Sequence, residues 1–233
     1  MSNFQLSLII PTFNEEKYLS RLLDNIRFQD LFSQVEIIVV DANSADKTKE
    51  IAEKQADVVL STSIRNRAHQ MNLGAKKATT NLLYFLPAYV IPPNRFIEII
   101  LENHQNGSKV GCFRQKFEEN SPLMKINSFF TRFNFSWCRG EDQTLFVDQF
   151  LFEQLNGYNE SFTVLEIYDF LNRAKKLERF SPLEQSAIVT MRKHSKYSWF
   201  RVQFVLGKAK RMYLKGADPA IIDKMFRKLL DPS

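Results

Sequence analysis

Polar residues follow directly after two apolar runs near the start of the chain. The run 6–10 leads into the letters PTFNEE, and the run 35–40 ends at Asp41, with Asn43 two residues further on. A turn from a strand into a helix leaves backbone N–H groups free for a polar ligand, and a carboxylate beside it can accept a ring N–H. The pattern indicates a ligand site. The alternative is that Asn14 is only a helix cap and Asp41 only a loop carboxylate.

Arginines open a predicted helix over 64–79. Arg65 and Arg67 stand at its start, and Asn72 lies about a turn and a half beyond Arg67. The fork of an arginine side chain fits the oxygens of a diphosphate. An arginine at the start of this helix could therefore contact a diphosphate, and the alternative is a solvated helix start.

Further cations lie in the letters MRKHSK, after the last predicted core strand. They include Arg192, Lys193 and His194. Such side chains can neutralise the negative charge of a ligand such as a diphosphate. A charge run of this kind is equally typical of a solvated face, and the sequence leaves both interpretations open.

Carboxylates stand in two stretches of the second half. Asp142 lies in GEDQTLF, whereas Glu166 and Asp169 lie in LEIYDF, one helical turn apart on the same face of a predicted helix over 165–177. A carboxylate in a site can take the proton from an attacking hydroxyl. Either Glu166 or Asp169 could therefore serve as a general base, and the alternative is that both are surface acids of a helix.

The elements that must position these residues alternate between strand and helix. Continuous apolar runs predict strands over 6–10, 35–40, 57–60 and 82–86, with helical spacing of apolar residues between them. Such an alternation is typical of a parallel sheet covered on both faces. We predict an α/β fold, with a Rossmann-like, mostly parallel sheet flanked by helices and a C-terminal helical extension.

Composition places the chain among ordinary globular proteins, with 233 residues, 44% hydrophobic and 25% charged. The net charge of +6 is uneven, because 171–233 holds 15 Lys and Arg against 5 Asp and Glu. Cys112 and Cys138 form no close pair, which favours a reducing compartment. We expect neither a signal peptide nor a membrane span. The acidic body and the lack of a known motif argue against nucleic-acid binding.

The combined motifs resemble those of nucleotide-diphospho-sugar glycosyltransferases of the A fold, family 2. The stretches LIIPTFNEEKYL, VEIIVVDANSADKT, RNRAHQMNLG, GEDQTLF and LEIYDF carry the likeness. Within that family, the chain resembles the small bacterial transferases labelled selenium- or radical-SAM-associated transferase 2. The resemblance implies a glycosyltransferase that uses a nucleotide-sugar donor, with UDP- or GDP-linked sugars favoured.

The resemblance also implies roles for single residues. The implied nucleotide-sugar contacts are Pro11, Thr12, Asn14, Glu15, Asp41, Asn43, Arg67 and Asn72. The diphosphate candidates are Arg65, Arg192, Lys193 and His194, and the catalytic candidates are Glu166, Asp142 and Asp169.

The sequence departs from the family at its metal site and at its usual base. The family implies Mn²⁺ or Mg²⁺ held by an aspartate after the fourth strand, but Pro87-Ala88-Tyr89 stands there and 82–97 holds no acid. Ile167 stands where the family has its usual catalytic aspartate. We therefore expect no metal ligands. The alternatives are a catalytically impaired relative that binds sugar nucleotides, or a peripheral membrane or partner-binding module.

We predict two units along the chain. Residues 1–195 form the transferase domain, with a nucleotide-binding half (1–106) and an acceptor half (107–195), and 196–233 form a basic amphipathic tail. Such a tail can lie on an anionic membrane, pack on the core or join a second copy. The expected partners are thus a lipid-linked acceptor, the membrane surface and a homodimer through the C-terminal helices. The expected location is the cytoplasm, at the inner face of the membrane.

Overall fold

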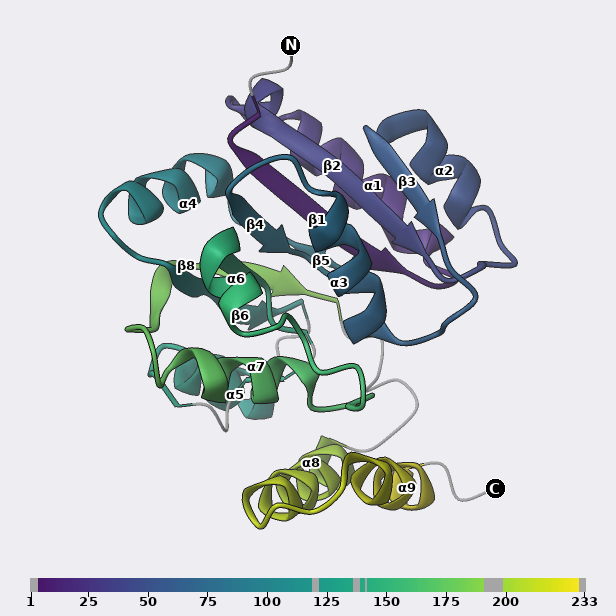
Figure 1. Cartoon of the computed structure of the whole chain (residues 1–233), viewed down its shortest axis with the longest axis vertical. Coiled ribbons are helices and arrows are strands. Elements are labelled where there is room, and N and C mark those ends of the chain that lie inside the picture. The colour runs from purple at the N-terminus through teal and green to yellow at the C-terminus, as the bar shows by residue number, and fades with distance from the viewer. Residues whose placement is uncertain (1–3, 119–121, 136–138, 141, 191–198, 231–233) are drawn as a thin grey trace.

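The computed structural model describes residues 4–118, 122–135, 139–140, 142–190 and 199–230 (Figure 1). In chain order its elements are β1 (Leu6–Thr12), α1 (Glu16–Arg27), the 3-10 helix η1 (Phe32–Gln34), β2 (Val35–Asp41), α2 (Thr48–Gln55), β3 (Val58–Ser61), α3 (Arg67–Lys77), β4 (Leu82–Phe85), β5 (Val90–Ile91), α4 (Phe96–Gln105), β6 (Val110–Phe117), α5 (Pro122–Phe130), β7 (Leu145–Asp148), α6 (Gln149–Gln154), α7 (Glu166–Ala174), β8 (Ser181–Val189), α8 (Trp199–Leu214) and α9 (Pro219–Leu230).

The described strands form one sheet in the order β3-β2-β1-β4-β7-β6-β8-β5. β1 pairs in parallel with both β2 and β4, and β2 pairs in parallel with β3. The strand order therefore reverses direction between β1 and β4. The carboxyl ends of strands at such a switch point are where open α/β sheets bind ligands. Thr12 and Asp41, paired in register, stand at this edge.

The rest of the sheet mixes directions. β7 pairs antiparallel with β4 and β6, whereas β8 pairs parallel with β6 and antiparallel with β5. The predicted α/β fold with flanking helices is confirmed, and its parallel character is strongest in the first half of the chain.

Two apolar clusters cover the two faces of the sheet. Leu8 of β1 faces a cluster that includes Leu22 of α1 and Phe96 of α4. Ile9, on the opposite face because side chains alternate along a strand, faces a cluster that includes Met71 of α3 and Phe170 of α7. The strand is thus apolar on both sides, which is why its sequence is a continuous apolar run.

Two local features differ from the predicted pattern. The chain turns after β4, with the Val90 N–H donating to the Pro87 carbonyl (3.0 Å), and β5 then pairs with β8. This short strand was not predicted, because it borrows its partner from a distant segment. α3 begins at Arg67 rather than at residue 64, since the Asn66 side chain caps it by accepting from the His69 N–H (3.1 Å).

The tail folds into α8 and α9, as its apolar spacing predicts. Ala209 and Ile222 are buried together with Phe162, Leu165 and Tyr168 from the segment around the start of α7. Figure 1 places both tail helices at one end of the molecule, beyond α5 and α7. Within the described ranges, none of the helices combines the length and the apolar character needed to cross a bilayer.

Candidate active site

The turns after β1 and β2 are bound to each other. Asn14 and Asn43 both have left-handed backbone with φ of 54°, a conformation that asparagine tolerates better than most residues. The Asn14 N–H donates to Ser44 Oγ (2.8 Å), and its side-chain Oδ1 accepts from the Ala45 N–H (2.9 Å). The N-cap of α1 is Glu15 rather than Asn14. Asn14 therefore holds the two turns together as one rim at the carboxyl edge of the sheet.

Asp41 is fully buried within this rim. Its Oδ1 accepts from Thr12 Oγ1 (3.0 Å) and from Ser44 Oγ (2.5 Å), and its Oδ2 accepts from the Ser44 N–H (2.9 Å). The carboxylate thus orders the turn that follows β2. Its contact with a nucleotide base stays a prediction.

α3 crosses the sheet edge and ties two strand ends together. Gln70 Nε2 donates to the carbonyl oxygens of Thr12 (2.8 Å) and Val40 (2.7 Å). A Cβ on Gly74 would lie 2.5 Å from Ile9 Cγ2, so a glycine lets the helix approach β1 this closely. Gln70 was quoted in a motif but not predicted as a site residue. Its role depends on two carbonyls that are far away in the sequence.

Asn72 holds a distant loop. Its Nδ2 donates to the Tyr158 carbonyl (2.9 Å) and to Glu160 Oε1 (2.8 Å), and its Oδ1 accepts from the Tyr158 N–H (2.9 Å). His69 Nδ1 lies 2.9 Å from Glu160 Oε2. Burial alone would raise the pKa of Glu160, but the hydrogen bonds from Asn72 and His69 keep it below its usual value. Asn72 thus fixes the loop ahead of α7, and its contact with a donor stays a prediction.

Arg67 and Glu166 form a buried ion pair between α3 and α7. Arg67 Nε donates to Glu166 Oε1 (2.8 Å), and its Nη2 lies 2.5 Å from the same oxygen. The side chains are 18% and 2% exposed. Glu166 Oε2 is buried and has no hydrogen-bond partner among the described residues. A pair this buried fixes the position of both groups, because separating them would leave a charge without a partner.

Tyr89 lies beside this pair and holds Asp142. Its hydroxyl donates to Asp142 Oδ1 (2.9 Å). Burial, reinforced by the charge of Asp142, raises the pKa of Tyr89 well above its usual value, so the hydroxyl stays protonated. Burial alone would lower the pKa of Arg67, but Glu166, Tyr89 and Asp142 together raise it. We call Arg67, Tyr89, Asp142 and Glu166 the edge cluster.

Arg65 and Asp169, which were also predicted from the sequence, lie outside the edge cluster. Arg65 is exposed, with its guanidinium carbon 4.3 Å from the centre of the Phe13 ring in the rim. Asp169 accepts from Arg173 Nε (2.8 Å) and from the Tyr213 hydroxyl (2.9 Å), so it links α7 to α8. The cations Arg192, Lys193 and His194 lie outside the described residues. The catalytic roles proposed from the sequence stay predictions.

The described residues at the sheet edge do not fit a divalent metal. Ala88 is buried in the apolar core, and Tyr89 points a hydroxyl where the resemblance implies a carboxylate. Ile167 is also buried in the core. In the part of the chain that the structure describes, no group of three or more His, Cys, Asp or Glu is arranged to hold a metal ion.

Sequence reasoning missed Tyr89 as a functional residue and noted it only as a replacement. The signal available was its position directly after the fourth strand, at the edge where ligands bind. The partner that gives it a role, Asp142, is 53 residues away. Glu160 was missed for the same reason, since its partners on α3 are about 90 residues distant.

Comparison with known proteins gives a family and a fold. Residues 7–164 match the protein family described as Glycosyl transferase family 2. A relative from Methanococcus voltae, dolichyl N-acetyl-alpha-D-glucosaminyl phosphate 3-beta-D-2,3-diacetamido-2,3-dideoxy-beta-D-glucuronosyltransferase, is 32% identical over 130 residues, which are 49% of this chain and 40% of that protein. The matched part of this chain therefore covers less than half of that relative.

Solved structures with the same fold come from more distant proteins. Staphylococcus aureus TarS 1–349 in complex with UDP-GlcNAc matches with a TM-score of 0.68 and 19% identity, over 98% of this chain and 72% of that chain. The mannosyltransferase PcManGT from Pyrobaculum calidifontis, in complex with GDP-Man and Mn²⁺, matches with a TM-score of 0.71 and 16% identity, over 97% and 69%. At these identities the likeness establishes the fold.

Proposed function

Because this chain belongs to glycosyl transferase family 2, we propose that it transfers a sugar from a nucleotide-diphospho-sugar to an acceptor hydroxyl. One observation carries the proposal: the edge cluster gathers two carboxylates, an arginine and a tyrosine at the switch point of the sheet. Sugar transfer needs a base for the acceptor and a positive charge for the leaving diphosphate. Both kinds of group lie together at this edge.

The donor is proposed to bind along the rim and the start of α3. The rim offers a shaped backbone that Asp41 and Asn14 hold in place, and the nucleotide lies against it. Arg65 and Arg67 then face the diphosphate. UDP- and GDP-linked sugars are the first candidates, since the structural neighbours were solved with UDP-GlcNAc and GDP-Man.

Asp142 is the proposed general base. It is only partly buried, so an acceptor hydroxyl can reach it, and Tyr89 orients it. In the reaction, the hydroxyl oxygen forms a bond to the anomeric carbon and its proton passes to the Asp142 carboxylate. The bond between the anomeric carbon and the diphosphate oxygen breaks, and the nucleoside diphosphate leaves with that electron pair. Glu166 acts as a positioning residue that holds Arg67.

We propose that an arginine offsets the negative charge of the leaving diphosphate. Arg67 keeps its positive charge because Glu166, Tyr89 and Asp142 surround it. Arg192, Lys193 and His194 remain candidates for the same task. PcManGT was solved with Mn²⁺, but the described residues at this edge form no group of His, Cys, Asp or Glu arranged to hold such an ion, so no step is assigned to one.

Donor binding and transfer are tested together. Thermal unfolding is measured with UDP-GlcNAc, GDP-mannose and the free nucleotides, each with Mn²⁺ and with a chelator. Saturation at about 100 Kd stabilises by about 2.7 kcal/mol, a shift of roughly 5–10 °C. Release of nucleoside diphosphate is then followed for Asp142→Asn, with Asp24→Asn on the exposed face of α1 as the control.

We expect a shift with one donor, unchanged by the chelator, and at least a 100-fold slower release in Asp142→Asn alone. Binding without release in the unaltered protein would instead support the alternative of an impaired, sugar-nucleotide-binding relative. No shift with any donor would contradict the proposal.

We further propose the finer divisions and partners that the sequence indicates. The nucleotide half is 1–106, the acceptor half is 107–195, and the tail is 196–233. A lipid-linked acceptor and attachment at the inner membrane face are supported by the dolichyl phosphate named in the Methanococcus voltae relative. Exposed Phe200 and Phe204 on the basic helix α8 fit that location. A homodimer through α8 and α9 is the alternative use of the same surface.

A further inference from the structure

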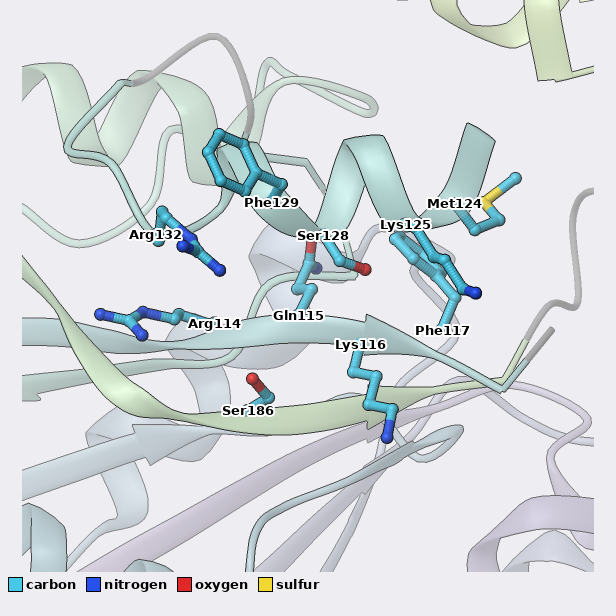
Figure 2. Close-up of a pocket in the computed structure, with 10 residues that line it drawn as sticks. All are labelled: Arg114, Gln115, Lys116, Phe117, Met124, Lys125, Ser128, Phe129, Arg132 and Ser186. Carbon is cyan, nitrogen blue, oxygen red and sulfur yellow. The ribbon is translucent and has the colours of Figure 1, made fainter. Parts of the chain in front are cut away.

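A pocket of about 360 Å³ lies between α5 and β6, and no residue of the edge cluster lines it (Figure 2). Of its ten lining residues, four are cationic, namely Arg114, Lys116, Lys125 and Arg132, and none is acidic. A concave surface lined by charge of one sign concentrates a ligand of the opposite sign. The lining therefore suits an anion.

In the part of the chain that the structure describes, these four cations have no acidic partner, unlike several other cations. Arg21, Lys109 and Arg173 each lie within 3.0 Å of a carboxylate oxygen. Among the described residues, no ion pair joins Arg114, Lys116, Lys125 or Arg132 to an acid. The positive charge of the pocket is therefore not neutralised by the described part of the protein.

Arg114 supplies the more specific sign of a missing ligand. Its Nε is shielded from solvent and has no hydrogen-bond partner among the described residues. A buried charged donor without an acceptor is unfavourable and rare in folded proteins. Figure 2 shows the Arg132 side chain reaching from the segment after α5 toward Arg114 on β6. An anion between the two guanidinium groups would supply the acceptor.

One face of α5 builds the upper side of the pocket. Met124, Lys125, Ser128 and Phe129 have the spacing of neighbours on one helix face, and Arg132 continues it. Ser128 adds a hydroxyl, whereas Lys116 leaves β6 on the side away from α5 (Figure 2). The anion end of the pocket is thus formed by Arg114, Arg132 and Ser128, with Lys125 further along.

Exposed apolar side chains adjoin this end. Phe129, Ile126 and Phe133 are 47%, 53% and 38% exposed, and the Phe129 and Phe133 rings lie 5.5 Å apart. The Arg132 guanidinium carbon lies 4.3 Å from the centre of the Phe129 ring. The same surface therefore offers a charged end and an apolar end.

We propose that this pocket binds the phosphate or diphosphate group of an amphiphilic ligand whose apolar chain lies on the exposed side chains of Ile126, Phe129 and Phe133. Arginine forks match phosphate oxygens, and the adjoining rings match a hydrocarbon chain. A free phosphate would use the first feature alone. The two together select a phosphate ester joined to an apolar chain.

The position of the pocket links it to the edge cluster. Phe117 of β6 lines the pocket and pairs with Val189 of β8. Val189 pairs in turn with Val90 of β5, the residue after Tyr89. Two strand spacings amount to about 10 Å. Arg114 of the anion end lies three residues, or about 10 Å, further along β6 than Phe117, so a sugar on a phosphate held there would reach Asp142 only by extending along β6. That role as acceptor site rests on the proposed function, whereas the binding itself does not.

Binding is measured by calorimetry on the full chain with farnesyl diphosphate, inorganic pyrophosphate and farnesol. We expect farnesyl diphosphate to bind at least 10-fold more tightly than either of the others. The paired change Arg114→Gln and Arg132→Gln should weaken it at least 10-fold. Lys76→Gln with Lys77→Gln, which removes the same charge from the exposed end of α3, should change it less than 2-fold.

Several outcomes would overturn the proposal. Pyrophosphate binding as tightly would exclude the apolar chain, farnesol binding as tightly would exclude the phosphate, and an equal loss in the lysine control would exclude the pocket. Binding to phosphatidylglycerol vesicles that depends on both arginines, with unchanged farnesyl diphosphate affinity, would assign them to the membrane surface instead.

Two controls keep these results separable. If the paired variant unfolds at a lower temperature, Arg132→Gln alone, at an exposed side chain, replaces it in the binding measurement. The thermal shift with the donor nucleotide is recorded on every variant. If the donor shift is retained while farnesyl diphosphate fails to bind, the pocket proposal fails without the proposed function. If farnesyl diphosphate binds and no donor does, the proposed function fails while the pocket proposal stands.

Discussion

At the scale of single residues, the sheet edge is organised by pairs that hold each other in place. Arg67 depends on Glu166, and Asp142 depends on Tyr89. Each pair joins a candidate catalytic or ligand-binding group to a residue that orients it. Substitution of the catalytic or ligand-binding member of a pair is therefore expected to affect stability and activity differently from substitution of the residue that orients it.

The Arg67–Glu166 pair gives a prediction on stability. Arg67→Ala leaves the Glu166 carboxylate 2% exposed and without its partner, so we expect a loss of about 3–5 kcal/mol in the free energy of unfolding. Arg67→Ala combined with Glu166→Gln should lose less than Arg67→Ala alone, because no buried charge then remains. Urea unfolding of the two single variants and the double variant measures the coupling. A double variant that loses the sum of both single effects would contradict a direct pair.

At the scale of elements, glycines decide how closely the segments around the edge approach. Gly157 has φ of +64°, and a Cβ there would lie 2.7 Å from Asn72 Oδ1. Gly107 has φ of +89° with nothing within 4 Å of its Cβ position. The two positions therefore separate backbone strain from steric contact.

Gly157→Ala is expected to destabilise by about 2–3 kcal/mol, and Gly107→Ala by about 1 kcal/mol. The difference should come from displacement of the Asn72 side chain and of the loop that it holds. Thermal unfolding gives both values, and hydrogen exchange at Tyr158, whose N–H donates to Asn72, reports the loop. Equal losses at the two glycines would show that the contact with Asn72 carries no cost.

The docking of α8 on α7 is predicted to depend on pH. Burial, followed by the charge of Asp169, raises the pKa of Tyr213 to about 12 from an ordinary value of 10.0. A raised folded-state pKa adds stability that is fully present below pH 10 and is lost as the pH rises toward 12. The cause is direct, since the phenol donates to Asp169 and a phenolate would repel it.

Tyr213→Phe should therefore lower the unfolding temperature at pH 8 and remove part of its decline between pH 10 and 12. Tyr18→Phe on α1 is the matched control. The difference in unfolding temperature between each variant and the unaltered protein, followed across this range, cancels the titration of other groups. A Tyr213→Phe curve that stays parallel to the unaltered one would contradict the role of this hydrogen bond.

At the scale of the whole molecule, the tail helices present one apolar and basic face to the outside. Phe200 and Phe204 are 65% and 69% exposed and four residues apart, so they lie on the same side of α8. Lys208 and Arg211 follow on the same helix and line a groove with Phe204. Aromatic and basic groups on one helix fit the surface of an anionic bilayer.

We expect Phe200→Ser with Phe204→Ser to reduce binding to phosphatidylglycerol vesicles at least 5-fold. The free energy of unfolding should change by less than about 0.5 kcal/mol, as is usual for exposed positions. Phe28→Ser, at an 87% exposed position after α1, is the control. Vesicle flotation measures the binding, and sedimentation of the same variants tests the competing use of this face in a dimer. Unchanged flotation with loss of a dimer would favour that competing use.

The sequence by itself determined the order of strands and helices in the first half, apart from the short strand β5, and the chemistry available at the strand ends. Both follow from local rules. Apolar runs and helical spacing depend only on neighbouring residues, and the end of a parallel strand reaches the sheet edge wherever the sheet forms. Asp41 and Arg67 could therefore be named as candidates without coordinates, whereas Asp142 and the departure at Ala88 and Tyr89 were recognised from the resemblance to the family.

Only the tertiary structure decided which of these residues meet. Arg67 finds Glu166 across 99 residues, and Tyr89 finds Asp142 across 53, distances over which no sequence periodicity carries information. The same holds for Asn72, which reads like a ligand contact in its motif but binds Tyr158 and Glu160. Side-chain partners are set by the packing of α3 and α7 against one sheet, and that packing exists only in the folded chain.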